Sequence, residues 1–243
     1  MKIRIDQLLV ERGLAGNVRL AAAYIMEGKV LVKGIVVSKP GYLVKATEEL
    51  LLNLPAVRYV GRGGLKLDGA LKKLNITVTG TTALDVGAST GGFTDCLLQH
   101  GAQRVYALDV GSGLLDYKLR NDKRVVVMEG INFRLFVPEG LISAIDVATV
   151  DVSFISLGLI LPNVLRCLKN GGYVLALIKP QFELEQNEVE RGGIVRSEEK
   201  RQKAVEKIQE TARRLGFSVI TVIPSDIKGT KGNQEFFIEL QKP

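Results

Sequence analysis

The stretch Ala83-Leu84-Asp85-Val86-Gly87-Ala88-Ser89-Thr90-Gly91-Gly92-Phe93 decides the fold of this chain. Its apolar start predicts a buried strand, its glycines predict a tight turn, and the residues after Gly91 predict a helix. A glycine turn between a strand and a helix lets a ligand approach the backbone closely, at the edge where parallel sheets open a crevice. Such turns also occur without a ligand, so the turn alone leaves a purely structural role open.

Two acidic residues narrow the choice of ligand. Asp85 stands at the end of the predicted strand, where a carboxylate would repel a pyrophosphate and attract a cation. Asp109 ends the next predicted strand, at a position where an acid binds a ribose diol. S-adenosylmethionine has a ribose and, at its methionine end, an ammonium and a sulfonium. The two acids therefore favour S-adenosylmethionine over NAD as the cofactor.

Predicted strands and helices alternate on both sides of this stretch. The strands are expected at 82–86, 104–109, 124–128, 145–150 and 172–178, and the helices at 63–74, 91–100, 113–120, 156–169 and 197–215. This alternation predicts an α/β, Rossmann-like parallel sheet that is covered on both faces. Phe217–Ile223 and Glu235–Leu240 are predicted as strands joined by a loop without a helix, so the final strand is expected to run antiparallel. Residues 181–196 lack periodicity and are predicted as a loop over the substrate or as a disordered surface insertion.

The first part of the chain has a different pattern, which predicts a small α+β domain. Helices are expected at 3–13, stopped by Gly13, and from an N-cap at Asn17 to about Glu27; strands are expected at 29–32, 35–37 and 50–54. Residues 55–64 are rich in Pro, Gly and Arg and are predicted as a linker. We therefore divide the chain into domains at 1–58 and 59–243.

The charge of the chain is unevenly spread. The 243 residues carry a net charge of +7, and residues 1–60 hold nine Lys or Arg against five Asp or Glu, which gives +4. A basic surplus favours an anionic partner, either a nucleic acid or a membrane surface. Cys96 and Cys167 are too few for a disulfide framework and have no metal-ligand spacing, so buried thiols and no metal site are expected. His100, the sole histidine, is predicted to cap a helix end.

The hydropathy pattern indicates a soluble protein. The first fifteen residues are charged and amphipathic, unlike a signal peptide. No run of the sequence reaches the roughly 20 apolar residues of a membrane span. We therefore expect a cytoplasmic location.

Three motifs, in this order, are similar to those of a known family. They are Asp85–Phe93, Asp151-Val-Ser-Phe-Ile-Ser-Leu157 and Ile178-Lys-Pro-Gln-Phe-Glu183. Together they resemble the TlyA (hemolysin A) family over essentially the whole chain, and its members resemble FtsJ-type RNA ribose 2′-O-methyltransferases. The resemblance implies a seven-stranded, S-adenosylmethionine-dependent methyltransferase that acts on ribosomal RNA at a ribose 2′-hydroxyl. Ribosomal RNA or ribosomal subunits are the implied partners, and DNA is not expected as one.

The resemblance also implies roles for individual residues. Asp85, Gly87, Ser89 and Gly91 would line the methionine end of the cofactor, Asp109 would hold its ribose, and Asn132 would lie beside the adenine, where FtsJ-type relatives often have Asp. The catalytic Lys-Asp-Lys-Glu group of FtsJ-like enzymes would correspond to Lys66, Asp151, Lys179 and Glu235.

The positions of two catalytic candidates support this assignment independently of the family. Asp151 and Lys179 each follow an apolar strand, and the carboxyl ends of parallel strands are where open sheets place their sites. Taken singly, each of the four has an ordinary alternative. Lys66 and Lys179 would also suit a solvated surface, Asp151 a helix cap and Glu235 an ordinary strand position.

Residues 3–50 resemble the S-four type of small RNA-binding domain. The resemblance rests on Arg4–Arg12, Ala21–Met26 and Gly28–Val37. Such domains bind structured RNA through basic side chains on phosphates. The candidates here are Arg4, Arg19, Lys29, Lys33 and Lys39. The second helix of this domain type often starts with Ser-Arg, whereas Asn17-Val18-Arg19 stands here, so a solvated basic surface remains the alternative.

Two other functions stay open from the sequence. One is a non-catalytic RNA-binding protein that has kept the cofactor pocket as a relic, although an intact Lys-Asp-Lys-Glu set argues against decay. The other is a membrane-active hemolysin, for which the sequence offers neither a spanning segment nor a secretion signal.

Overall fold

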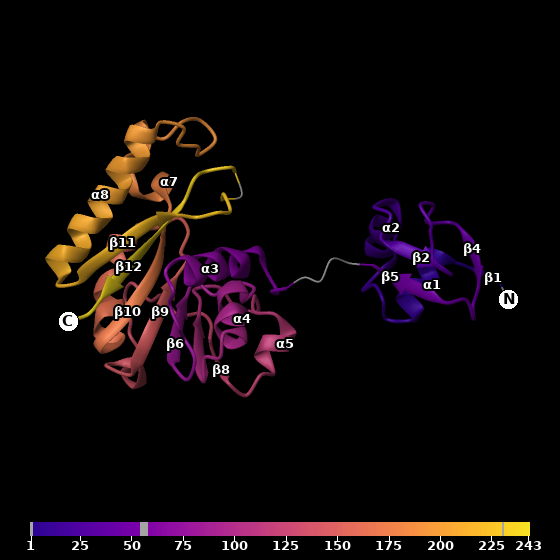
Figure 1. The fold of residues 1–243 in the computed structure, drawn as a ribbon, viewed down its shortest axis with the longest axis horizontal. Helices are drawn as coiled ribbons and strands as arrows, with labels where there is room; N and C mark the ends of the chain where they lie inside the picture. Colours follow the sequence, from indigo (N-terminus) through magenta and orange to yellow (C-terminus); the bar gives the residue numbers. More distant parts are fainter. Residues whose placement is uncertain (1, 54–57, 230) are drawn as a thin grey trace. The chain divides into compact units, whose positions relative to one another are not determined.

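The computed structural model describes residues 2–53, 58–229 and 231–243 and contains two compact units, residues 1–57 and 58–243 (Figure 1). Each unit has a hydrophobic core of its own. The first residues of the predicted linker, 55–57, lie outside the described residues, as does the end of the strand predicted at 50–54.

The described residues of the N-terminal unit, 2–53, form two helices and five short strands. They are β1 (Lys2–Arg4), α1 (Ile5–Glu11), α2 (Val18–Met26), β2 (Val30–Val32), β3 (Ile35–Val36), β4 (Leu43–Lys45) and β5 (Leu50–Leu52). Strands β3, β2 and β5 form one antiparallel sheet, and β1 pairs with β4. The core is apolar and comes mainly from the two helices, with Val30 of β2 and Val44 of β4; the helix residues are Ile5, Leu8, Leu9, Ala21 and Ile25.

Two predictions for this unit are confirmed, the N-cap at Asn17 and the tight turn between the strands at 29–32 and 35–37. The side chain of Asn17 caps α2, because its Oδ1 accepts a hydrogen bond from the backbone N–H of Leu20 at 2.9 Å. Lys33 and Gly34 have φ of 50° and 80°, and these left-handed residues form the tight turn that joins β2 to β3.

The helix predicted at 3–13 is shorter than expected. It begins at Ile5 because Lys2 and Ile3 pair with Lys45 and Val44 of β4 as an extended strand. It ends at Glu11, with Arg12 as its C-cap and Gly13 in a left-handed conformation, φ 69°. The sequence did not predict β4. Strands of three residues have too few positions to show the alternation that marks a longer strand.

The C-terminal unit alternates strands and helices around one large sheet. Its main elements are α3 (Arg62–Lys73), β6 (Thr82–Val86), α4 (Gly92–Gln99), β7 (Arg104–Leu108), α5 (Tyr117–Arg120), β8 (Val125–Met128), β9 (Ile145–Val150), α6 (Leu161–Cys167), β10 (Leu168–Ile178), α7 (Pro180–Glu183), α8 (Glu198–Leu215), β11 (Ser218–Pro224) and β12 (Phe236–Gln241). Three short 3-10 helices are η1 (Glu139–Leu141), η2 (Leu157–Leu159) and η3 (Gln186–Glu188).

The sheet has seven strands in the order β11-β12-β10-β9-β6-β7-β8. Strands β6 to β10 are parallel, and β12 pairs antiparallel with both β10 and β11, as predicted. Strand β6 lies in the middle of the sheet: β7 and β8 lie on one side of it, and the next strand in the chain, β9, lies on the other side. This switch point opens a crevice at the carboxyl ends of β6 and β9.

Alternate strand residues face two separate cores. Leu84, Ala148 and Ala176 pack on the side of α6 and α8. Their neighbours Ala83, Val147 and Leu175 pack on the side of α3 and α4. Figure 1 shows α8 on one face of the sheet and α3 with α4 on the other. The Rossmann-like α/β fold predicted from the sequence is therefore confirmed.

The helix predicted at 113–120 is mostly a loop. Only Tyr117–Arg120 is helical, because the Glu129 carboxylate accepts hydrogen bonds from the backbone N–H groups of residues 113, 114 and 115 at 2.9, 3.0 and 3.2 Å. Those N–H groups are thus satisfied by a side chain instead of by a helix.

The helix predicted at 156–169 begins late and ends early. Ser156 caps the short η2, and α6 starts only at Leu161, with Pro162 in its first turn. The helix ends at Cys167 because Leu168 already pairs with Ile145 as part of β10.

Residues 181–196 are not a structureless insertion. They contain the end of α7, η3 and an antiparallel bridge between Glu190 and Ile194. Two lysines of α8 hold this segment: Lys200 Nζ donates to the backbone oxygen of Glu188 at 2.8 Å, and Lys203 pairs with its carboxylate at 2.6 Å. The anchors come from distant residues, so local periodicity did not reveal them.

Three smaller predictions are also decided by the structure. Cys96 and Cys167 are buried free thiols, as expected. His100 stands at the C-cap of α4, and its Nε2 lies 2.8 Å from Asp68 Oδ1. Among the described residues, every helix is too short or too polar to span a bilayer.

Candidate active site

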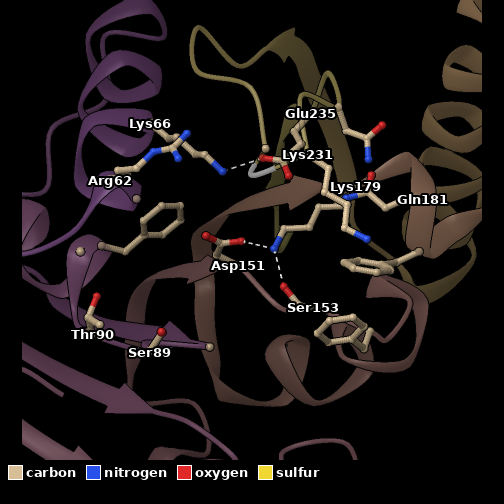
Figure 2. Close-up of a pocket in the computed structure, with 18 of the residues that line it drawn as sticks. Arg62, Lys66, Ser89, Thr90, Asp151, Ser153, Lys179, Gln181, Lys231 and Glu235 are labelled. Atoms are coloured by element: carbon tan, nitrogen blue, oxygen red, sulfur yellow. Dashed lines mark hydrogen bonds and ion pairs between the residues drawn. The ribbon is translucent and has the colours of Figure 1, made fainter. Parts of the chain in front are cut away.

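A cleft of about 670 Å³ opens at the carboxyl ends of the central strands. It lies between the first turn of α3, the glycine turn after β6, the loops after β9 and β10, and the loop before β12 (Figure 2). Its size is that of a typical pocket for a small molecule or cofactor. All four residues predicted as catalytic line this cleft.

The four catalytic candidates form two ion pairs. Lys66 Nζ lies 2.6 Å from Glu235 Oε2, and Lys179 Nζ lies 2.6 Å from Asp151 Oδ1. Lys179 also donates a hydrogen bond to Ser153 Oγ at 2.9 Å. Figure 2 shows both pairs directed into the same cleft from different elements.

Burial makes these pairs unlike ordinary surface ion pairs. Lys179 is 8% exposed and Glu235 only 2%. Interactions between charges strengthen as water is excluded, and an isolated buried charge would be costly. Each lysine is therefore held in a defined place by the carboxylate beside it, which is the arrangement a catalytic group needs.

The backbone brings the loop of Asp151 against the glycine turn. The N–H of Asp151 donates to Val86 O at 3.0 Å. A side chain at Gly87 would place its Cβ 2.6 Å from Asp151 O, and Gly87 has a φ of +84°. Only glycine fits here, because both the conformation and the space exclude a side chain.

The candidates for the nucleoside end of a cofactor, Asp109 and Asn132, lie together beside the cleft, next to its lining residue Ser89, and are not themselves among the lining residues. Asp109 Oδ2 accepts a hydrogen bond from Ser89 N, and Oδ1 accepts one from Gly111 N, both at 2.8 Å. A carboxylate has about four acceptor sites, so two remain for ribose hydroxyls. The N–H of Ile131 donates to Asp109 O at 3.1 Å, which brings the exposed Asn132 close to this acid.

Asp85 and Gly91 lie beneath the turn and are not among the residues that line the cleft. Asp85 is fully buried and accepts hydrogen bonds from Thr94 Oγ1 at 2.7 Å and Thr149 Oγ1 at 3.0 Å. Burial raises the pKa of Asp85 to about 7. A side chain at Gly91 would strike Leu119, so this glycine permits close packing of the core. Direct contact of Asp85 or Gly91 with a cofactor stays a prediction.

The structure adds cleft residues that the sequence reasoning missed. Ser153 and Phe154 stand in the motif 151–157, and Gln181 and Phe182 follow Lys179. Phe154 is 90% exposed with a left-handed φ of 64°, and its ring centroid lies 5.1 Å from that of Phe182. The motifs themselves carried this signal, because each pair begins two residues after a predicted catalytic residue.

The basic candidates of the N-terminal unit are mostly paired with acids. Arg4 binds both carboxylate oxygens of the buried Asp6, at 3.1 and 2.6 Å, and lowers the pKa of that acid. Lys29 lies 2.5 Å from Glu27, and Lys33 lies 2.9 Å from Glu48. The last two candidates, Arg19 and Lys39, are exposed. The exposed Lys29–Glu27 and Lys33–Glu48 pairs contribute little to stability.

The fold and the site together define a class of protein. A seven-stranded sheet with an antiparallel β12, a glycine turn after β6 and an acid after β7 are the features of an S-adenosylmethionine-dependent methyltransferase. Comparison with known families makes the class specific: the FtsJ-like methyltransferase family matches residues 59–242, and the S4 domain family matches residues 3–50. The chain belongs to the FtsJ-like methyltransferase family and carries an S4 domain at its N-terminus.

Individual relatives agree with this assignment. The chain is 41% identical, over 99% of its own length and 90% of the relative's, to a protein of Mycobacterium tuberculosis named 16S/23S rRNA (cytidine-2′-O)-methyltransferase TlyA. It is 40% identical to Hemolysin A of Brachyspira hyodysenteriae, over 96% and 98% of the two chains. A solved structure from Streptococcus thermophilus is 43% identical, with a TM-score of 0.75 and coverage of 99% and 88%.

Proposed function

We propose that this protein transfers a methyl group from S-adenosylmethionine to a ribose 2′-hydroxyl of ribosomal RNA. The observation that carries the proposal is the presence of two ion pairs, Lys66–Glu235 and Lys179–Asp151, at one cleft beside the glycine turn, with Glu235 and Lys179 buried and their partners partly buried. Relatives named as rRNA 2′-O-methyltransferases over nearly the whole chain support the same substrate.

Residues of the cleft, together with Asp109 and Asn132 beside it, suit the cofactor. Gly87 and Ser89 of the glycine turn line the cleft, and the two free acceptor sites of Asp109 suit a ribose diol. In this proposal Gly87 and Ser89 hold the methionine end, Asp109 the ribose and Asn132 the adenine edge. S-adenosylmethionine supplies a methyl group activated by its sulfonium.

The catalytic task of the protein is to place a weak nucleophile and to manage its proton. Lys179 is the best placed group, since it follows β10 and is held by Asp151 and Ser153. In its neutral form, Lys179 would accept the proton of the hydroxyl as the oxygen–methyl bond forms. Asp151 and Ser153 orient Nζ, and Lys66 with Glu235 forms the opposite wall of the cleft.

The N-terminal unit is proposed to bind the RNA. We propose domains at 1–58 and 59–243, with phosphate contacts from the basic set Arg4, Arg19, Lys29, Lys33 and Lys39; of the linker predicted at 55–64, residues 62–64 belong to α3 and Tyr59 to the core of the second unit. The match to an S4 domain and the +4 charge of this region support that role. Because ribosomal RNA or a ribosomal subunit is the proposed partner, the reaction is placed in the cytoplasm.

One assay separates this function from the two that the sequence left open. Purified protein is incubated with labelled S-adenosylmethionine and ribosomal subunits, and also with dye-filled lipid vesicles. We expect label on the RNA and intact vesicles. RNA binding without transfer would indicate a relic pocket, and vesicle lysis without transfer would indicate a hemolysin.

A further inference from the structure

Glu183 is a buried carboxyl group that the proposed chemistry does not use. It stands at the end of α7 and is 2% exposed. Its Oε2 accepts a hydrogen bond from the Ser156 hydroxyl at 2.5 Å, and its Oε1 accepts one from the backbone N–H of Leu157 at 2.8 Å. Both oxygens are therefore committed to the start of η2.

These two hydrogen bonds connect the two loops that carry the Lys179–Asp151 pair. Asp151 and Ser153 lie on the loop after β9, which ends at η2. Lys179 lies on the segment after β10, directly before α7. Figure 2 shows Lys179 between Asp151 and Ser153, so the distance between the two loops sets this contact.

The loop after β9 needs such an anchor. Phe154 has a left-handed φ of 64°, a conformation that is unfavourable for a residue with a bulky side chain. The contact of its ring with Phe182 is a second link between the same two segments. A loop of this kind holds one shape only when its surroundings fix it.

The nearby lysine does not form a hydrogen bond with the Glu183 carboxylate. Lys207 lies near, but its Nζ donates to the backbone oxygen of Glu183, at 2.5 Å. Burial raises the pKa of Glu183, which means that the folded protein disfavours the charged form. A carboxyl group buried at such a cost, with both oxygens on one loop, serves the position of that loop.

We propose that Glu183 is a positioning residue for methyl transfer: through Ser156 and Leu157 it holds Asp151 and Ser153 at hydrogen-bonding distance from Lys179. This inference rests on the proposed function. Glu183 acts through these neighbours and does not contact the substrate. Its loss is expected to slow the chemical step and to leave cofactor binding in place, because the glycine turn and Asp109 lie on other strands.

The test compares three variants with the wild-type protein. Glu183→Ala removes both hydrogen bonds, and Ser156→Ala removes one. Glu183→Gln keeps both, because its amide oxygen can accept from Leu157 N and its NH₂ can donate to the Ser156 oxygen. Glu188→Gln is the control, since it alters an acid of the same segment that pairs with Lys203 on α8.

The measurements are the single-turnover methylation rate at saturating RNA and cofactor, and cofactor affinity by calorimetry. We expect Glu183→Ala to lower the rate by about 10²-fold, the cost of a displacement of roughly 1 Å in a reactive geometry. Ser156→Ala should be intermediate. Glu183→Gln should recover most of the rate, and Glu188→Gln should match the wild type, with cofactor affinity unchanged in all of them.

Several results would overturn the inference. A Glu183→Ala protein with the wild-type rate would show that the two hydrogen bonds do not matter. A rate loss in Glu183→Ala that appears only below saturating RNA would assign Glu183 to substrate binding instead. If Glu183→Ala does not fold, the other two variants decide the question. A wild-type rate in Ser156→Ala would refute the positioning role. A folded Glu183→Gln protein whose rate is about 10²-fold below that of the wild type would refute it as well. Failure of the wild-type protein to methylate RNA would instead refute the proposed function itself.

Discussion

At the scale of single residues, the site consists of charged side chains that are held in place by ion pairs in a partly buried cleft. Lys66, Asp151, Lys179 and Glu235 were assigned from the sequence as a set, and the structure places them around one cleft as two ion pairs. Ser153 and Glu183 were missed, because their importance comes from contacts across loops. The spacing of residues in the sequence predicts which residues end a strand. It does not predict which side chains of another loop those residues contact.

Asp85 illustrates the same limit and gives a prediction about pH. Its position before the glycine turn suggested contact with a cofactor, whereas the structure shows it buried between Thr94 and Thr149. The pKa of Asp85 is raised to about 7 in the folded protein, so the folded state binds a proton more tightly than the unfolded state. Its contribution to stability is therefore full below the unfolded pKa, about 3.9, and is lost as pH rises towards 7.

The variant Asp85→Asn should remove this pH dependence. Its free energy of unfolding, relative to the wild type, is expected to rise between about pH 4 and pH 7 and to level off above that range. Denaturant unfolding at a series of pH values measures the difference. A difference that is independent of pH over this range would show that Asp85 is ionised throughout.

At the scale of elements, sequence patterns predicted the helices and strands correctly where an element is long and buried. The strands β6, β7, β9 and β12 and the helices α3, α4 and α8 lie close to their predicted ranges, because strong apolar periodicity and glycine stops mark them. The errors fall where a distant side chain satisfies the backbone. Glu129 does so for residues 113–115, and this contact replaces the first turns of the predicted helix.

The segment 181–196 offers a test at this scale. The buried Asn233 holds its end in place, since its Oδ1 accepts from Val195 N at 2.9 Å and its Nδ2 donates to Gly193 O at 2.7 Å. Asn233→Ala would leave the buried N–H of Val195 unpaired, so we expect a loss of about 1–3 kcal/mol in unfolding free energy. Hydrogen exchange should become faster around residues 190–196 while α8 keeps its protection. Unchanged exchange in this segment would show that its other anchors suffice.

At the scale of the whole molecule, the chain has two units with separate cores, and we propose a separate role for each. The charge distribution predicted an anionic partner for the N-terminal region, and the motifs predicted a cofactor cleft in the rest. How the two units are arranged on RNA could not be derived from the sequence, since periodicity and motifs describe each unit by itself.

Removal of residues 1–57 tests this division. The truncation keeps Arg58, whose guanidinium binds Asp68 of α3 at 2.9 Å. We expect weaker RNA binding and a flatter dependence of affinity on salt, because fewer counterions are released. Cofactor affinity should stay unchanged. Equal RNA affinity and an equal salt slope in the truncated protein would mean that the S4 domain has another task.

The central claim is that the methyl group goes to a ribose 2′-hydroxyl under the control of Lys179. RNA labelled by the protein is hydrolysed in alkali, which cleaves every linkage except those beside a methylated 2′-oxygen. We predict label in alkali-resistant dinucleotides, and a single-turnover rate about 10²–10⁴-fold lower for both Lys179→Ala and Lys179→Arg, since arginine does not readily give up a proton. Label in mononucleotides, or a fully active Lys179→Arg enzyme, would contradict the account.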